Sequence, residues 1–175
     1  QTAYAVGQDR SFRKGRWPVG QNDGGIAFGA GLSRAPAGKL WASTGLFFHL
    51  PNGHLFMDQR DAGPGVITNT TLQRSTNDGV TWGTVLTLPV GVTFLGPTSV
   101  ARDEVTGYLY AVEYAPGTTD IAKGTVDIWR SVDDGATWAV WVSFPQSVGS
   151  ANPDAIRHWH SARYDSVSQR VYFTA

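Results

Sequence analysis

The chain has 175 residues, which is enough for one domain with a buried core. Its 14 Lys and Arg residues balance its 14 Asp and Glu residues, so no overall positive field draws it to nucleic acid. It has no cysteine and no run of the roughly 20 apolar residues that cross a bilayer, so we expect no disulfide, thiolate chemistry or membrane insertion. The 21 glycines, 9 prolines and 7 tryptophans favour short strands joined by turns, which predicts an all-β fold.

Alternating apolar and polar residues, separated by turn residues, predict two successive groups of strands. The first group comprises 46–50, 54–57, 68–74 and 82–88. The second group comprises 98–102, 108–114, 125–130 and 138–144. Each group is typical of a four-stranded antiparallel unit whose strands follow one another in the chain.

One short motif occurs twice, 56 residues apart, before the last strand of each group. We call the copies box 1 (residues 75–82) and box 2 (residues 131–138), and an arginine precedes each one. The shared positions are Ser75, Asn77, Asp78, Gly79, Thr81 and Trp82 in box 1, and Ser131, Asp133, Asp134, Gly135, Thr137 and Trp138 in box 2. A turn that recurs at a fixed period indicates a repeat architecture.

Partial copies of the same unit lie on both sides of these two groups. Residues 163–172 align with residues 101–110, so a third unit begins there, and 22–24 is a degenerate echo of box 1. We therefore divide the chain into an N-terminal arm or half unit (1–37), two full units (38–95 and 96–150) and the start of another unit (151–175).

The two boxes resemble the Asp-box, or BNR repeat, of sialidase-like β-propellers. The resemblance implies a β-propeller of four-stranded antiparallel blades, with about two full and two half blades present. Two explanations are open: the chain is a fragment of a larger propeller, or several subunits complete one ring. The resemblance also implies that the boxes lie at the blade periphery, where they are structural turns rather than catalytic groups.

The catalytic set of sialidases is not matched. That family uses three arginines, an aspartate, and a tyrosine paired with a glutamate. Residues 52–60 resemble the stretch after the first arginine, which makes Arg60 a candidate ligand-binding residue, but the matching strand at 43–48 has no arginine. We assign no catalytic residue. Asp58, Asp61 and Glu113 stand near strand ends and are either solvated polar residues or a source of glycosidase carboxylates.

The most suggestive polar cluster is Arg157-His158-Trp159-His160. On a strand, His158 and His160 point to the same side, so both imidazoles could meet one ligand or one metal ion, while Trp159 faces the core. The spacing marks no third metal ligand, so we expect no metal and no other cofactor. Arg157, His158 and His160 are candidate ligand-binding residues, and packing between blades is the alternative.

Together these features favour a non-catalytic module that binds a glycan or other ligand, or that serves in structural assembly. The partners we expect are a glycan and other protein chains of the same assembly, in an extracellular or virion setting such as a phage tail. The alternatives are a sialidase-like or other glycoside hydrolase whose catalytic residues lie outside this chain, and an oligomeric propeller lectin.

Overall fold

The computed structural model describes residues 2–6, 11–16, 27–28, 33–37, 39–41, 44–61, 70–117, 123–147 and 154–175. In these ranges the chain forms fifteen strands in antiparallel sheets and one short 3-10 helix, η1 (Pro97–Ser99). The all-β prediction is confirmed. Within the same ranges, no helix has the length and apolar character needed to span a membrane.

The first sheet contains the described residues of the region where we expected an arm or half unit. Its strands are β1 (Thr2–Val6), β2 (Ser11–Arg16), β3 (Ala27–Phe28) and β4 (Ser33–Arg34). β2 pairs antiparallel with each of the other three strands, so this part of the chain is a sheet and not a free arm. The echo of box 1 at 22–24 lies outside the described residues.

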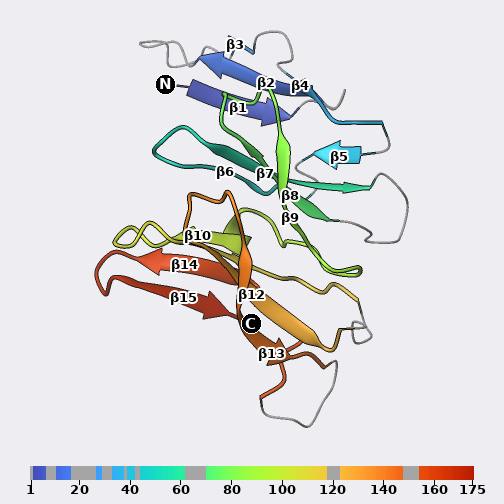
Figure 1. The fold of residues 1–175 in the computed structure, drawn as a ribbon, viewed down its shortest axis with the longest axis vertical. Coiled ribbons are helices and arrows are strands. Elements are labelled where there is room, and N and C mark those ends of the chain that lie inside the picture. The colour runs from blue at the N-terminus through green and yellow to red at the C-terminus, as the bar shows by residue number, and fades with distance from the viewer. Residues whose placement is uncertain are drawn as a thin grey trace.

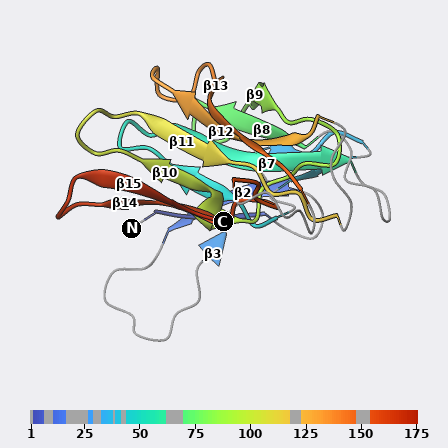
Figure 2. The ribbon, with the colours of Figure 1, turned by 90° about the horizontal axis from the view of Figure 1, so that it is seen from below.

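Two larger sheets follow along the long axis of the molecule (Figure 1). The second sheet contains β5 (Lys39–Trp41), β6 (Phe47–His49), β7 (Leu55–Asp61), β8 (Thr71–Ser75) and β9 (Gly83–Thr87). The third sheet has the order β10 (Val100–Arg102), β11 (Leu109–Val112), β12 (Thr125–Ser131) and β13 (Ala139–Pro145). The last strands of these sheets, β9 and β13, lie on one side of the molecule, and β10 and β14 lie on the other (Figure 2).

The strands of the two larger sheets pair in the same register, so the repeat in the sequence is also a repeat in the structure. Leu55 pairs with Ser75 in the second sheet, and Leu109 pairs with Ser131 in the third. Each sheet also has a bulge at the same point of its last strand pair, between Leu72 and Gln73 and between Ile128 and Trp129. A bulge bends a strand and increases its twist, so the shared position gives both sheets the same curvature.

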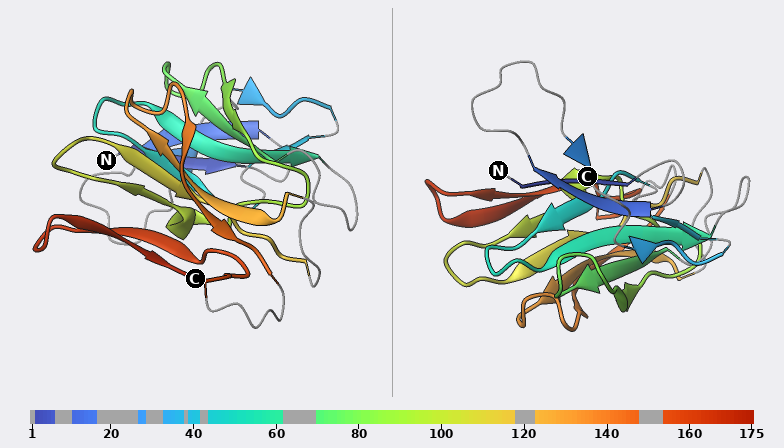
Figure 3. Two further views of the ribbon diagram at one scale, coloured as in Figure 1. Left: turned by 60° about the horizontal axis from the view of Figure 1, so that its bottom comes forward. Right: turned by 90° about the horizontal axis from the view of Figure 1, so that it is seen from above.

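A two-stranded hairpin, β14 (Ser161–Asp165) and β15 (Arg170–Thr174), completes the described fold. It copies β10 and β11 down to the turn. Asp103 accepts hydrogen bonds from the backbone amides of Val105 and Thr106, and Asp165 accepts them from the amides of residues 167 and 168. The hairpin packs alongside β10 and β11 as a further layer (Figure 3).

The predicted strand at 98–102 is wrong at its start. Residues 97–99 form η1, and β10 begins only at Val100. Pro97 has no amide hydrogen for a sheet ladder, and Gly96 turns the backbone before it with φ of 124°. The other predicted strands of the two large sheets lie within a few residues of their segments, and β7 runs on to Asp61. β5 was not predicted: it pairs with the far end of β7, so the second sheet has five strands where four were expected.

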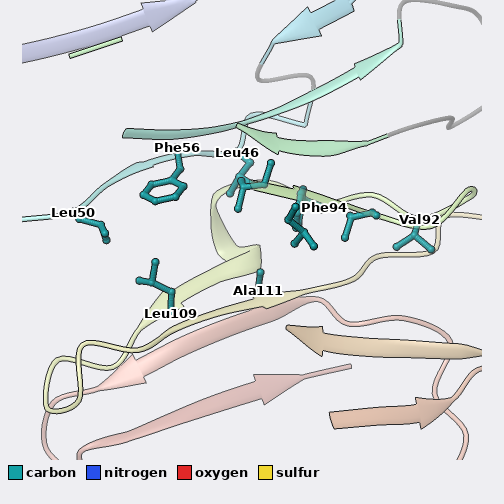
Figure 4. Packing of buried hydrophobic residues seen from close by; sticks show 10 residues of the cluster. Leu46, Leu50, Phe56, Val92, Phe94, Leu109 and Ala111 are labelled. Carbon is teal, nitrogen blue, oxygen red and sulfur yellow. The ribbon is translucent and has the colours of Figure 1, made fainter. Parts of the chain in front are cut away.

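The core lies between sheets, because the middle strands are buried on both faces. Along β11, Leu109 and Ala111 pack toward the second sheet, while Tyr110 and Val112 pack toward the hairpin. Figure 4 shows Phe56 and Leu46 on the side of the second sheet, facing Leu109 and Ala111 across the interface. Alternate residues of one strand point to opposite faces, so a single run of apolar residues serves two interfaces.

Candidate functional site

Box 2 uses its polar atoms to hold its own turn. The amide of Gly135 donates to Ser131 Oγ at 2.9 Å, and the amide of Thr137 donates to Asp133 Oδ1 at 2.9 Å. Trp138 Nε1 donates to the carbonyl of Gly135 at 3.2 Å, which fixes the indole over the turn. Burial raises the pKa of the Asp133 carboxyl, but hydrogen bonds from Thr137 and Ser131 outweigh it and lower the pKa to about 2.

Box 1 repeats this arrangement with an amide in place of the carboxylate. The amide of Gly79 donates to Ser75 Oγ at 2.9 Å, and the amide of Thr81 donates to Asn77 Oδ1 at 2.9 Å. Trp82 Nε1 donates to the carbonyl of Gly79 at 3.0 Å. The asparagine accepts the same backbone bond as Asp133, so the turn depends on an acceptor oxygen and not on a charge.

Box 2 also joins the two large sheets. Asn52, in the turn between β6 and β7, donates from Nδ2 to Asp134 Oδ2 at 3.0 Å. Gly135 faces the ring of Phe56, and a Cβ atom at Gly135 would lie 2.5 Å from two carbons of that ring. The glycine and both aspartates of box 2 therefore stabilise the fold, and the candidate ligand-binding residues lie elsewhere in the chain.

A cluster of three rings forms at the start of the hairpin. The ring centroids of Tyr114 and His158 lie 4.3 Å apart, those of His158 and His160 lie 4.9 Å apart, and those of Tyr114 and His160 lie 6.2 Å apart. His158 is buried and His160 is exposed, so the cluster reaches from the interior to the surface. Two predicted residues are therefore brought together with a tyrosine that sequence analysis did not single out.

The protonation of His158 follows from its partner. Its Nδ1 lies 2.9 Å from the carbonyl oxygen of Ala115, which can only accept, so Nδ1 carries the hydrogen and Nε2 is left as an acceptor in the neutral ring. Burial lowers the pKa of His158, and the neighbouring His160 and Arg157 lower it further against the opposing effect of Ala115. We therefore expect a neutral imidazole in neutral solution.

The backbone around the cluster is held from several sides. The amide of Trp159 donates to the carbonyl of Glu113 at 3.1 Å, and the amide of His160 donates to the carbonyl of Thr174 at 2.7 Å. Thr98 Oγ1 donates to the carbonyl of His160 at 3.2 Å. Trp159 itself is buried in the core between the third sheet and the hairpin, as predicted.

The strand on which we expected the two histidines begins later than predicted. β14 starts at Ser161, and residues 157–160 are irregular backbone ahead of it. His158 and His160 still face one another because Ala115 and Thr98 position them from outside the hairpin. The alternation of a strand, which was the reason given for their proximity, is wrong for these residues.

The other predicted ligand residues lie apart from the rings. Arg157 is exposed and donates from Nη2 to the carbonyl of Gly117 at 3.0 Å. Arg60 lies in β7, half-buried and opposite Leu40 of β5. Among the described residues, the histidine rings contact Tyr114, each other and the carbonyl of Ala115, and Arg60 is not one of these partners. By register, Arg60 and Tyr114 occupy the same position of successive repeats.

A buried carboxylate lies behind the cluster. Glu113 accepts hydrogen bonds from Lys123 Nζ at 2.6 Å, from the Asp127 amide at 2.8 Å and from Trp129 Nε1 at 2.9 Å. Burial raises its pKa, and these three donors oppose the increase. Both oxygens of Glu113 are occupied by protein donors, so its geometry suits a structural role better than acid–base catalysis.

The remaining carboxylates considered from the sequence are also bonded. Asp58 is buried and accepts a hydrogen bond from the amide of Thr44 at 3.1 Å, and Asp61 forms an ion pair with Lys39. Among the residues that the structure describes, no group of three or more His, Asp or Glu side chains is arranged to hold a metal ion.

Comparison with known proteins gives structural likenesses but no family. A scan of protein-family models finds no match, and a search of curated proteins finds none. Among solved structures, the chain is similar to a protein of unknown function from Dyadobacter fermentans, with 17% identity and a TM-score of 0.46. The likeness covers 92% of this chain and 43% of that protein. The chain therefore spans less than half of that neighbour.

Sequence reasoning missed Tyr114, which provides the third ring. It lies 44 residues before His158, and no spacing rule connects the two positions. Its only sequence signal is its place at the end of the second strand of its repeat, where the preceding repeat has Arg60. This position holds Arg60 in one repeat and Tyr114 in the next, and comparing the two would have pointed to that end of the sheets.

Proposed function

We propose that this chain is part of an Asp-box β-propeller and acts as a non-catalytic ligand-binding module. The repeated register and bulges of the second and third sheets support equivalent blades. The hairpin supports the start of another blade, because its turn copies the turn between β10 and β11. Propeller blades are four-stranded antiparallel sheets. The third sheet has this form, whereas the second has five strands because β5 and β6 both pair with β7.

The observation that carries the binding function is the ring cluster of Tyr114, His158 and His160. The segments that lead into β6, β10 and β14 run next to one another, since Thr98 bonds to the carbonyl of His160 and a Cβ atom at Gly96 would lie 3.0 Å from the carbonyl oxygen of Thr44. In a propeller such segments lie at the mouth of the central channel. The cluster is then placed where a ligand can reach it.

The chemistry of the cluster favours a hydroxylated ligand such as a glycan. The Nε2 atom of His158 accepts a hydrogen bond from a hydroxyl group, and the exposed ring of His160 offers both a nitrogen and a flat face. A few fixed polar groups beside aromatic surface are the usual composition of a small-molecule site. An extracellular or virion setting is part of the proposal and rests on analogy with the fold alone.

Binding is tested with a glycan array, followed by NMR titration of the histidine imidazole signals with the glycans retained. The variants are His160→Ala and His158→Gln, in which the glutamine amide can still donate to Ala115. We expect each to weaken binding about tenfold, because a lost hydrogen bond with a fixed partner costs about 0.5–1.5 kcal/mol and the stacking surface is lost as well. His49→Ala, which removes an exposed histidine of β6, is the matched control.

Two results would contradict the binding function. One is a glycan that binds without moving the signals of His158 or His160. The other is equal binding by the wild type and both variants at matched thermal stability. The propeller is tested separately by the intact mass of the protein from its natural source, measured in denatured and native form. A denatured mass above 18.9 kDa, or a native multiple of it, supports blades beyond those in this chain.

A further inference from the structure

The turn between β6 and β7 contains an asparagine followed by a glycine, Asn52 and Gly53, which is the only such pair in the sequence. Both residues are exposed, and Gly53 has φ of 87°. Glycine has no Cβ atom to shield its backbone nitrogen, so this nitrogen can approach the carboxamide of the preceding residue closely. By the register of the two large sheets, the equivalent turn of the next repeat has Thr106 and Gly107, which lack the carboxamide.

The carboxamide of Asn52 joins the second and third sheets. Its Nδ2 donates to Asp134 Oδ2 at 3.0 Å, and its Oδ1 accepts from the amide of His54 at 3.1 Å. Asp134 belongs to box 2, so this bond links a turn of one sheet to a turn of the next. A carboxamide has both a donor and an acceptor, whereas a carboxylate has only acceptors. A chemical change from one to the other therefore removes the donor on which this contact depends.

The boxes also contain a glycine that follows an aspartate, but their geometry protects it from the same chemistry. Gly79 and Gly135 are buried, and the amide of each donates to a serine Oγ at 2.9 Å. The aspartate carboxylate, when ionised, also resists attack by a nitrogen atom. The amide of Gly53 donates to the carbonyl of Leu50 at 2.9 Å, but it does so in an exposed turn, where local opening costs little free energy. Of these three turns, the one between β6 and β7 is therefore the one open to reaction.

We propose that Asn52 is a site of spontaneous deamidation, and that the product weakens the contact between the second and third sheets. The backbone nitrogen of Gly53 loses its proton and attacks Cγ of Asn52, and the side-chain nitrogen leaves as ammonia, which closes a succinimide ring. Water then opens the ring at either carbonyl, which gives aspartate or isoaspartate. The net change is one water consumed and one ammonia released, so the reaction needs no oxidant or reductant.

Both products carry a carboxylate and lack the Nδ2 donor of Asn52. In the aspartate product the new carboxylate faces Asp134, so two like charges replace a hydrogen bond of 3.0 Å. In the isoaspartate product the backbone is also longer by one carbon, which displaces the turn. Neither Asn52 nor Asp134 belongs to the ring cluster, so the inference is independent of the function proposed above.

The first test follows the full chain during incubation in neutral buffer at physiological temperature. Peptide mapping by mass spectrometry measures the fraction of each asparagine converted to the acid over time. Asn77 of box 1 is the matched control, because it also lies in a turn but is held by Thr81 and is followed by Asp78. We expect Asn52 to react at least about tenfold faster than Asn77, and Asp134→Ala to increase the rate at Asn52 about twofold by freeing the carboxamide.

The second test measures urea unfolding of variants that do not react. Asn52→Asp carries the product carboxylate, and Asn52→Thr, which copies the next repeat, lacks both the amide and the charge. We expect Asn52→Asp to have the lower urea midpoint of the two. Combining Asn52→Asp with Asp134→Asn exchanges donor and acceptor and is expected to restore the wild-type midpoint, since asparagine tolerates the φ of 55° at position 134. Reaction at Asn52 no faster than at Asn77, or equal midpoints for Asn52→Asp and Asn52→Thr, would overturn the proposal.

Discussion

Replacing Gly135 with alanine tests whether box 2 packs against the neighbouring sheet. The glycine has φ of 75°, which an L-residue adopts only with strain. The added methyl group would also lie 2.5 Å from Cε1 and Cζ of Phe56, well inside van der Waals contact. Phe56 is fully buried and stacks on Phe48 with centroids 4.5 Å apart, so its ring has little room to move away.

The two costs can be separated in magnitude. An alanine in the left-handed region costs about 1–2 kcal/mol relative to glycine. Overpacking of a filled core costs about 1–3 kcal/mol. We therefore expect Gly135→Ala to lower the free energy of unfolding by about 2–5 kcal/mol, a large fraction of the total for a domain of ordinary stability.

The chain offers a control in which only the first cost arises. Gly124 has φ of 68°, but a Cβ atom there meets nothing within 4 Å. Gly124→Ala is expected to cost about 1–2 kcal/mol, so the difference between the two variants reports the contact with Phe56. Urea unfolding followed by tryptophan fluorescence measures both variants, provided that their slopes agree. If Gly135→Ala is no less stable than Gly124→Ala, the packing of box 2 on the second sheet is not as described.

Three further predictions concern the polar groups of the third sheet. Ser131→Ala leaves the amide of Gly135 without its acceptor and is expected to lower the free energy of unfolding by about 1–3 kcal/mol in urea; an unchanged midpoint would contradict this. The pKa of Asp133 falls from 3.8 to about 2 on folding, so the ionised carboxylate stabilises the folded state fully above pH 3.8, and this contribution is lost as the pH falls toward 2. Asp133→Asn should therefore make the free energy of unfolding less dependent on pH between these values. An unchanged midpoint of acid unfolding in this variant would argue against the shift. Glu113→Ala leaves the Asp127 amide and Trp129 Nε1 without their acceptor, while Lys123 keeps its bond to Asp127, so the loss should be about 2–4 kcal/mol by thermal or urea unfolding, whereas a loss below about 1 kcal/mol would show that water replaces the carboxylate.

The strands and the repeat were predictable because their signals are local. The alternation along 108–114 and the turn residues at 103–107 are read within a few residues, and the hairpin of β10 and β11 forms there. The box motif carries its own hydrogen-bond partners, so Ser131 and Gly135 could be assigned to one turn from their spacing. The start of β10 was missed because Pro97 and Gly96 together favour a 3-10 turn over a continuous strand.

The ring cluster was predictable only in part, because it depends on contacts between distant segments. The spacing of His158 and His160 indicated a pair, but the reason was wrong, since neither residue lies in a strand. Their rings meet through bonds to Ala115 and Thr98, which are 43 and 62 residues away from their partners. No pattern in a single sequence predicts such contacts, and Tyr114 was missed for the same reason.

Comparison of the repeats indicates which residues are free to carry function. The serine and glycine of the box are identical in both repeats because they bond to each other within the turn, so these groups are not available to a ligand. By register, the positions of His158 and His160 are taken by Gly96 and Thr98 in the preceding repeat. At Gly96 the close approach of a neighbouring carbonyl leaves no room for a side chain, whereas the next repeat places a ring at the same position. The backbone differs there as well, since Gly96 has φ of 124° and residues 97–99 form η1, whereas residues 157–160 are irregular and His158 has no positive φ. The positions at which the repeats differ are therefore where binding should be sought first.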